Sequence, residues 1–162
     1  MGRPDDLLLR EIGALAHLFS GNYAQALRMF ESMCDRCREY EGESHCRQFV
    51  LRAKEGLAMA RGVVGIGETE HEFRLVIDLE KCHLGEEHPD IYTTYHRFAM
   101  VLATRGRVED AQRWYSQAAK GRKERLGPDH PLTRHSERMV VEVADTVSSA
   151  ALGTGVAGKV GE

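Results

Sequence analysis

A six-residue signature occurs twice in this 162-residue chain, at a spacing of 42 residues. The two copies are Leu84-Gly85-Glu86-Glu87-His88-Pro89 and Leu126-Gly127-Pro128-Asp129-His130-Pro131, and a degenerate third copy lies upstream at Gly42-Glu43-Ser44-His45-Cys46. Self-similarity at a period of about 20 to 50 residues indicates stacked structural units. The signature predicts a helix end, a short link and a new helix, because glycine suits a helix C-cap and proline the first helical turn.

Apolar residues spaced three and four apart predict helices along almost the whole chain. We expect them over Leu7–Phe19, Tyr23 to about Glu39, Val50 to about Arg61, Glu68–Leu84, Ile91–Thr104, Val108–Leu126 and Leu132 to about Leu152. They form three pairs in units at residues 7–49, 50–91 and 92–133, and a terminal helix at 134–152 completes a domain of residues 1–152. The middle pair is expected to be the least regular, because three glycines interrupt it and each costs a helix roughly 1 kcal/mol against alanine. The glycine-rich residues 153–162 are expected to form a flexible tail.

The composition narrows the choice of partner and location. The formal charge of −3 is too balanced to predict nucleic acid or an anionic membrane surface as a partner. No apolar run approaches the roughly 20 residues of a membrane span, and the first residues lack the apolar core of a signal peptide. Four cysteines without a secretory signal predict reduced thiols in a cytoplasmic protein.

The third unit resembles a tetratricopeptide repeat in the register of its small, large and aromatic residues. That unit supplies Phe98-Ala99, Leu102, Gly106, Ala111, Tyr115 and Ala118, and the first unit supplies Ala14, Gly21, Tyr23, Ala26, Phe30 and Met33. The second unit departs, with Val64 at the position of the turn glycine and Thr69 at that of the small alanine. The 42-residue period and the Leu-Gly-x-x-His-Pro link are similar to the kinesin light chain type of this repeat. The resemblance implies an all-α, right-handed superhelical solenoid of about three helix pairs plus a C-terminal helix.

The same resemblance implies a concave groove, lined by the first helices, that binds a peptide or protein segment. The groove positions in its register are Glu11 and Leu15, then Lys54, Ala58 and Arg61, then His96, Met100 and Thr104. In the kinesin light chain type an asparagine at the first of these positions holds the ligand backbone, whereas here that position holds Glu11, Lys54 and His96. Lys54, Arg61 and Arg97 would give the groove a cationic middle suited to a mixed or acidic segment. The competing interpretation is a solvated helix face without a ligand.

Other motifs in the sequence give weaker indications of metal binding, of a nucleotide cofactor and of catalysis. Cys34 and Cys37, followed by His45-Cys46, have the spacing of half a zinc site, but the second half is missing and no metal is expected. The tail matches phosphate-loop patterns but follows a helix instead of a strand, so no nucleotide cofactor is expected. The recurrence of His88 and His130 in the links favours a structural role over catalysis. Trp114 and Tyr115 are adjacent, so only one of them can lie in the core.

These observations predict a non-catalytic module that binds a protein or peptide segment as an adaptor or sensor. The first alternative is a structural or self-associating module, in which Val140, Val143 and Val147 form an apolar end of the stack. The remote alternative is a metal-binding helical domain built on Cys34 and Cys37.

Overall fold

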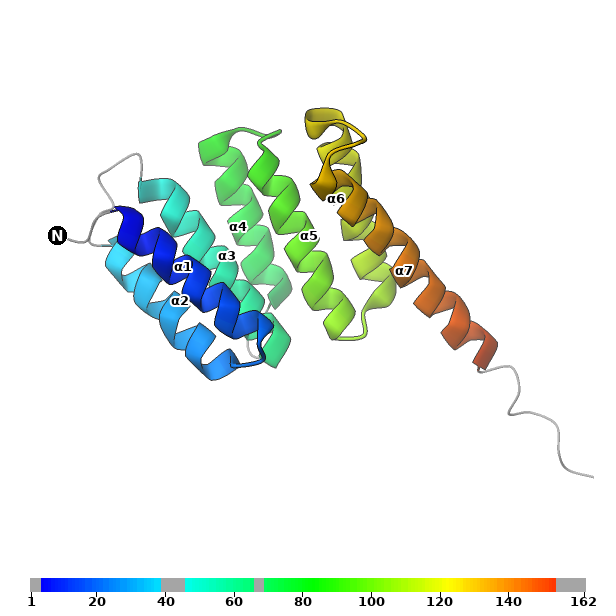
Figure 1. Ribbon diagram of the computed structural model, residues 1–162, viewed down its shortest axis with the longest axis horizontal. Coiled ribbons are helices and arrows are strands. Elements are labelled where there is room, and N and C mark those ends of the chain that lie inside the picture. Colours follow the sequence, from blue (N-terminus) through cyan, green and yellow to red (C-terminus); the bar gives the residue numbers. More distant parts are fainter. Residues whose placement is uncertain (1–3, 39–45, 66–68, 154–162) are drawn as a thin grey trace, which may run out of the picture. The chain divides into compact units, whose positions relative to one another are not determined.

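The computed structural model describes residues 4–38, 46–65 and 69–153, and within these ranges the protein is entirely helical (Figure 1). The helices of these ranges are α1 (Pro4–Phe19), α2 (Tyr23–Arg38), α3 (Cys46–Val64), α4 (Thr69–Leu84), α5 (Pro89–Thr104), α6 (Val108–Leu126) and α7 (Pro131–Gly153). The all-α prediction is confirmed. The predicted flexible tail lies outside the described residues, except for Gly153, which ends α7.

The helices belong to two compact units, Met1–Thr94 and Tyr95–Glu162, and the division falls inside α5. In the first unit α1 packs against α2, α3 packs against both, and α4 packs against α3 (Figure 1). In the second unit α6 packs along α7, and aromatic side chains of α5 contact α6. Successive helices therefore pack as neighbours, which is the arrangement of a helical repeat solenoid.

The contact between α2 and α3 depends on a glycine. Phe30 of α2 is completely buried, and a Cβ atom added at Gly56 of α3 would lie only 2.1 Å from Cε1 of the Phe30 ring. The ring therefore occupies the space that a side chain at position 56 would fill. Ala26 and Met33 are also buried on this face of α2, so the spacing read from the sequence identifies the face correctly.

The repeated signature forms a helix end, a link and a helix start, as the sequence predicts. Gly85 and Gly127 follow α4 and α6 with φ angles of 96° and 91°, a left-handed region that glycine enters without strain. In each link the histidine caps the next helix, because Nδ1 of His88 accepts the Asp90 N–H and Nδ1 of His130 accepts the Leu132 N–H, both at 3.2 Å. The structural role expected for these two histidines is therefore confirmed as helix capping.

A second repeated feature is polar and buried, and no sequence motif indicates it. The Thr94 hydroxyl donates to Oε1 of Glu80 at 2.9 Å, and 42 residues later Nη1 of Arg122 donates to Oγ of Ser136 at 2.7 Å. All four residues are at most 3% exposed. Each pair joins the last turns of one helix to the first turns of the next, so a buried hydrogen bond recurs at equivalent positions.

The second hairpin differs from the others at its turn. The helix expected to end near Arg61 continues to Val64, since Gly62 is buried inside it. The turn glycine is Gly65, which has a φ of 80° and lies one residue after the predicted position. Four residues separate α3 from α4, whereas three separate α1 from α2 and α5 from α6. Thr69 is buried at the position of the small alanine, as the register implies. The predicted irregularity of this hairpin therefore lies in its turn.

Candidate functional site

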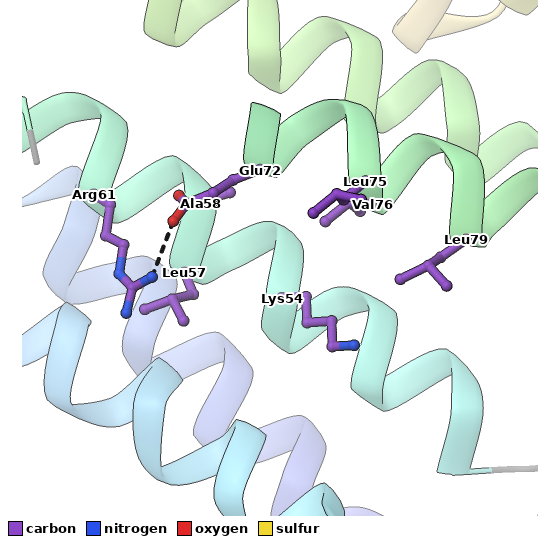
Figure 2. A pocket seen from close by; sticks show the side chains of 8 residues that line it. All are labelled: Lys54, Leu57, Ala58, Arg61, Glu72, Leu75, Val76 and Leu79. Atoms are coloured by element: carbon purple, nitrogen blue, oxygen red, sulfur yellow. Dashed lines mark hydrogen bonds and ion pairs between the residues drawn. The ribbon is translucent and has the colours of Figure 1, made fainter. Parts of the chain in front are cut away.

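A pocket of about 300 Å³ lies between α3 and α4 in the first unit (Figure 2). Its lining combines apolar and charged side chains, which are Lys54, Leu57, Ala58 and Arg61 of α3 with Glu72, Leu75, Val76 and Leu79 of α4. The volume is at the lower end of the range for ligand pockets. Lys54, Ala58 and Arg61 are the three groove positions that the family register assigns to the second unit, and the pocket brings them together.

The apolar surface of this pocket arises from the periodicity of the two helices. Leu75, Val76 and Leu79 are three and four residues apart and so share a face of α4, and Leu57 and Ala58 face them from α3 (Figure 2). Val76 is buried, whereas Leu75 remains 49% exposed. The small side chain of Ala58 contributes little volume at this point, so space remains between the helices. The result is an apolar depression with an exposed leucine at its rim.

The charge of Arg61 is compensated by two carboxylates. Its guanidinium lies 3.0 Å from Oε1 of Glu72 (Figure 2) and 3.6 Å from Oε1 of Glu31. One partner comes from α4 and the other from α2, so the sequence spacing gave no sign of either contact. The hypothesis of a cationic groove therefore has to be revised at this position, because Arg61 is already engaged within the protein.

Lys54 provides the pocket with an available positive charge. Its side chain is exposed at the end of the pocket away from Arg61 (Figure 2), and it forms no ion pair with any residue in the described ranges. At the opposite end, Oε2 of Glu72 is buried and accepts no hydrogen bond from the described part of the chain. The pocket therefore has a cationic end, an apolar middle and the Arg61–Glu72 ion pair at its other end.

The groove positions of the first unit are less accessible. Glu11 is only 7% exposed, and its Oε2 lies 3.6 Å from Nη1 of Arg52 on α3. This contact ties α1 to α3, and Glu11 cannot meet a partner while it persists. Leu15 is half-buried. Partner binding by Glu11 therefore has no support in this geometry, although the ion pair explains why an acid occupies the position.

The third-unit position His96 lies in a polar cluster within the second unit. Its Nδ1 is 3.1 Å from the hydroxyl of Ser136, which also accepts the hydrogen bond from Arg122, and its ring lies 4.8 Å from that of His135. Tyr115 contacts the same imidazole edge-on. Burial, followed by the nearby charges of Arg122, His135 and Arg97, lowers the pKa of His96 to about 3. The imidazole is therefore neutral at physiological pH and joins α5 to α7.

This serine and histidine form a pair that sequence spacing could not reveal, because they are 40 residues apart. Ser136 is fully buried, so its hydroxyl cannot reach the carbonyl of a bound substrate. A histidine with such a low pKa is also a weak base at neutral pH. The pair acts as a structural hydrogen bond. Burial also lowers the pKa of Arg122 to about 10, so its guanidinium remains charged while it bridges Ser136 and the Leu132 carbonyl oxygen.

The remaining groove positions lie on the second-unit part of α5. Arg97 and Met100 are half-buried, and Thr104 is exposed. The Thr104 hydroxyl donates to the Met100 carbonyl oxygen at 2.9 Å, a local contact within the helix. None of the three shares the pocket of α3 and α4, and their role in partner binding stays a prediction.

The metal and aromatic hypotheses have different outcomes. The side chains of Cys37, His45 and Cys46 lie outside the described residues, so the C-x2-C hypothesis is not tested; among the side chains that are described, no three metal-ligating groups cluster. Tyr115 is the core member of the adjacent aromatic pair, at 1% exposure. Trp114 is half-buried inside the α5–α6 hairpin, with its ring 5.1 Å from Tyr95 and 5.0 Å from Phe98.

Comparison with known families identifies the repeat. Residues 93–132 match the sequence profile of the tetratricopeptide repeat family. The match covers most of α5, all of α6 and the link to α7, the part of the chain whose register carries the resemblance. Residues 93–132 therefore form a tetratricopeptide repeat, and repeats of this family serve as protein-interaction modules. The kinesin light chain subtype stays a prediction.

No curated protein matches the chain in sequence. In the described ranges, no helix combines the length and the apolar content that crossing a bilayer requires.

Proposed function

We propose that this protein is an adaptor that binds a segment of a partner protein in the pocket between α3 and α4. The observation that carries the proposal is the convergence of three groove positions of the repeat register, Lys54, Ala58 and Arg61, on one open apolar pocket. A concave, mostly apolar lining with a few charged groups is the usual character of a binding pocket. The concave groove, the handedness of the array and the cytoplasmic location remain predictions of the sequence.

A comparative capture experiment tests the proposal. Wild-type protein, Leu75→Asp and Val141→Asp are immobilised and exposed to native lysate, after circular dichroism has shown equal helicity. Val141 is a matched control, because it is a 59% exposed apolar residue on α7. We expect a partner that wild type and Val141→Asp retain and Leu75→Asp loses, because a carboxylate at position 75 places charge against the apolar segment. Equal retention by all three proteins would contradict the proposal.

Self-association is the alternative function, and its apolar surface has to be reassigned. Val143 is only 6% exposed and belongs to the core of the second unit, so it cannot form the exposed apolar end expected from the sequence, and the side chain of Val147 lies outside the described residues. What favours self-association is α1, where Leu8, Leu9, Ile12 and Phe19 are between 43% and 68% exposed. Exposed apolar patches of this kind mark interaction sites.

Sedimentation separates the two functions. If α1 mediates self-association, the mass of the wild-type protein rises with concentration and Ile12→Asp abolishes the rise. A monomeric wild type over the whole concentration range would exclude this alternative and leave the adaptor function unaffected.

A further inference from the structure

We infer that the occupant of the α3–α4 pocket is an internal acidic–apolar segment of the partner, about three residues long, whose carboxylate pairs with Lys54. The inference rests on the proposed function and specifies the chemistry of the ligand. It follows from the charges and the length of the pocket.

The distribution of charge selects an acidic ligand. Glu72 and Glu31 compensate Arg61, whereas Lys54 has no ionic partner in the described part of the chain. The apolar surface between these ends, formed by Leu57, Leu75 and Leu79, lowers the local dielectric and strengthens an ion pair formed beside it. A ligand carboxylate therefore gains the most binding free energy at the Lys54 end, whereas an amine would gain none there.

The other end of the pocket disfavours a second charge. There Arg61 and Glu72 already form an ion pair at 3.0 Å, and Oε2 of Glu72 is buried. An uncharged polar residue of the ligand, such as asparagine, suits this end because it leaves the ion pair undisturbed.

The spacing of the two ends sets the length of the segment. Lys54 and Arg61 are seven residues apart on α3, which is about 10 Å at about 1.5 Å per residue. An extended peptide rises about 3.3 Å per residue, so roughly three residues span the pocket. The central residue then places its side chain against the leucines. Because Lys54 is exposed, the bound chain can continue past it into solvent, and the carboxylate is assigned to an Asp or Glu side chain within the partner.

Synthetic peptides test the inference by fluorescence polarisation. The probe has the core Asp-Leu-Asn, in either direction, between glycine and serine residues, with both ends capped so that the side chain carries its single carboxylate. The comparison peptides replace Asp by Asn, replace Leu by Ser, or end in a free Leu carboxylate without an Asp. The protein variants are Lys54→Glu and, as a matched control, Lys120→Glu at an exposed lysine of α6.

We expect the capped acidic probe to bind wild type and Lys120→Glu equally. Lys54→Glu lowers the affinity about tenfold, each replacement in the peptide lowers it at least fivefold, and added salt weakens binding to wild type because exposed charge pairs are screened. Equal binding of the Asn peptide, no effect of Lys54→Glu, or binding of the free-carboxylate peptide alone would overturn the inference. If no peptide binds while Leu75→Asp still loses the captured partner, the inference is wrong and the adaptor function stands.

Discussion

Replacing Gly56 by alanine should destabilise the protein, although alanine is the better helix former. The added Cβ would lie 2.1 Å from Cε1 of Phe30, whereas carbon atoms in contact are about 3.5 to 4.0 Å apart, so the ring or the backbone must move by about 1.5 Å. Phe30 is fully buried, so the ring cannot turn out into solvent without losing its core contacts. Overpacking of this kind costs about 1 to 3 kcal/mol. At the upper end of this range, a gain of about 1 kcal/mol in helix propensity leaves a net loss of about 2 kcal/mol in the free energy of unfolding.

Gly13 provides the matched control for this prediction. A Cβ atom at Gly13 would lie 3.1 Å from the terminal methyl of Met29, which can shift by a few tenths of an ångström at little cost. Gly13→Ala should therefore be neutral or up to about 1 kcal/mol more stable than wild type. Urea unfolding followed by far-UV circular dichroism measures both variants. A Gly56→Ala protein as stable as wild type would refute the packing argument, and a double-mutant cycle with Phe30→Leu should show coupling if the ring is the cause.

Two further predictions concern histidines. The pKa of His96 is lowered to about 3 in the folded protein, so below pH about 6.5 the unfolded chain binds a proton at this histidine and the folded protein does not. The free energy of unfolding should therefore be unaffected by His96 above that pH and should fall by about 1 to 2 kcal/mol between pH 6.5 and 5. Urea unfolding across this range should show the slope in wild type and in the exposed control His71→Asn. Burial also lowers the pKa of His135, so His96→Asn should reduce the slope without abolishing it, and a slope as steep in His96→Asn as in wild type would contradict the assignment. His130→Ala should cost about 1 kcal/mol through the lost helix cap, measured as a change in the unfolding midpoint, and His130→Ser should recover most of it; equal losses in both variants would show that the cap contributes nothing.

The sequence predicts the parts of this fold that depend on local interactions. Helices and their links follow from apolar spacing and from capping residues, so α6 and the two Leu-Gly-x-x-His-Pro links could be assigned from their own residues. The end of α3 lies three residues beyond the predicted one, because Gly62 is buried in the helix, where packing outweighs propensity. The Phe30–Gly56 contact joins two helices, and no local pattern encodes it.

The candidate site could be predicted only in part, for the same reason. The repeat register identifies Lys54, Ala58 and Arg61 as groove positions, and all three line the pocket. Whether the charges of Lys54 and Arg61 are paired within the protein, however, depends on residues from other helices. Arg61 is compensated by a glutamate of α2 and another of α4, and Glu11 is buried against α3. Sequence spacing within one helix cannot show which charged positions remain available, so Lys54 emerges as the open cation only in the folded protein.

Hydrogen–deuterium exchange of the purified protein, with and without the partner that it captures, tests the central claim most directly. If the partner segment lies between α3 and α4, amide protection should rise in peptides that cover residues 54–61 and 72–79, and it should rise less when Leu75→Asp is used. Unchanged exchange in both stretches, together with new protection in α1 or α7, would contradict the assignment of the binding site to this pocket.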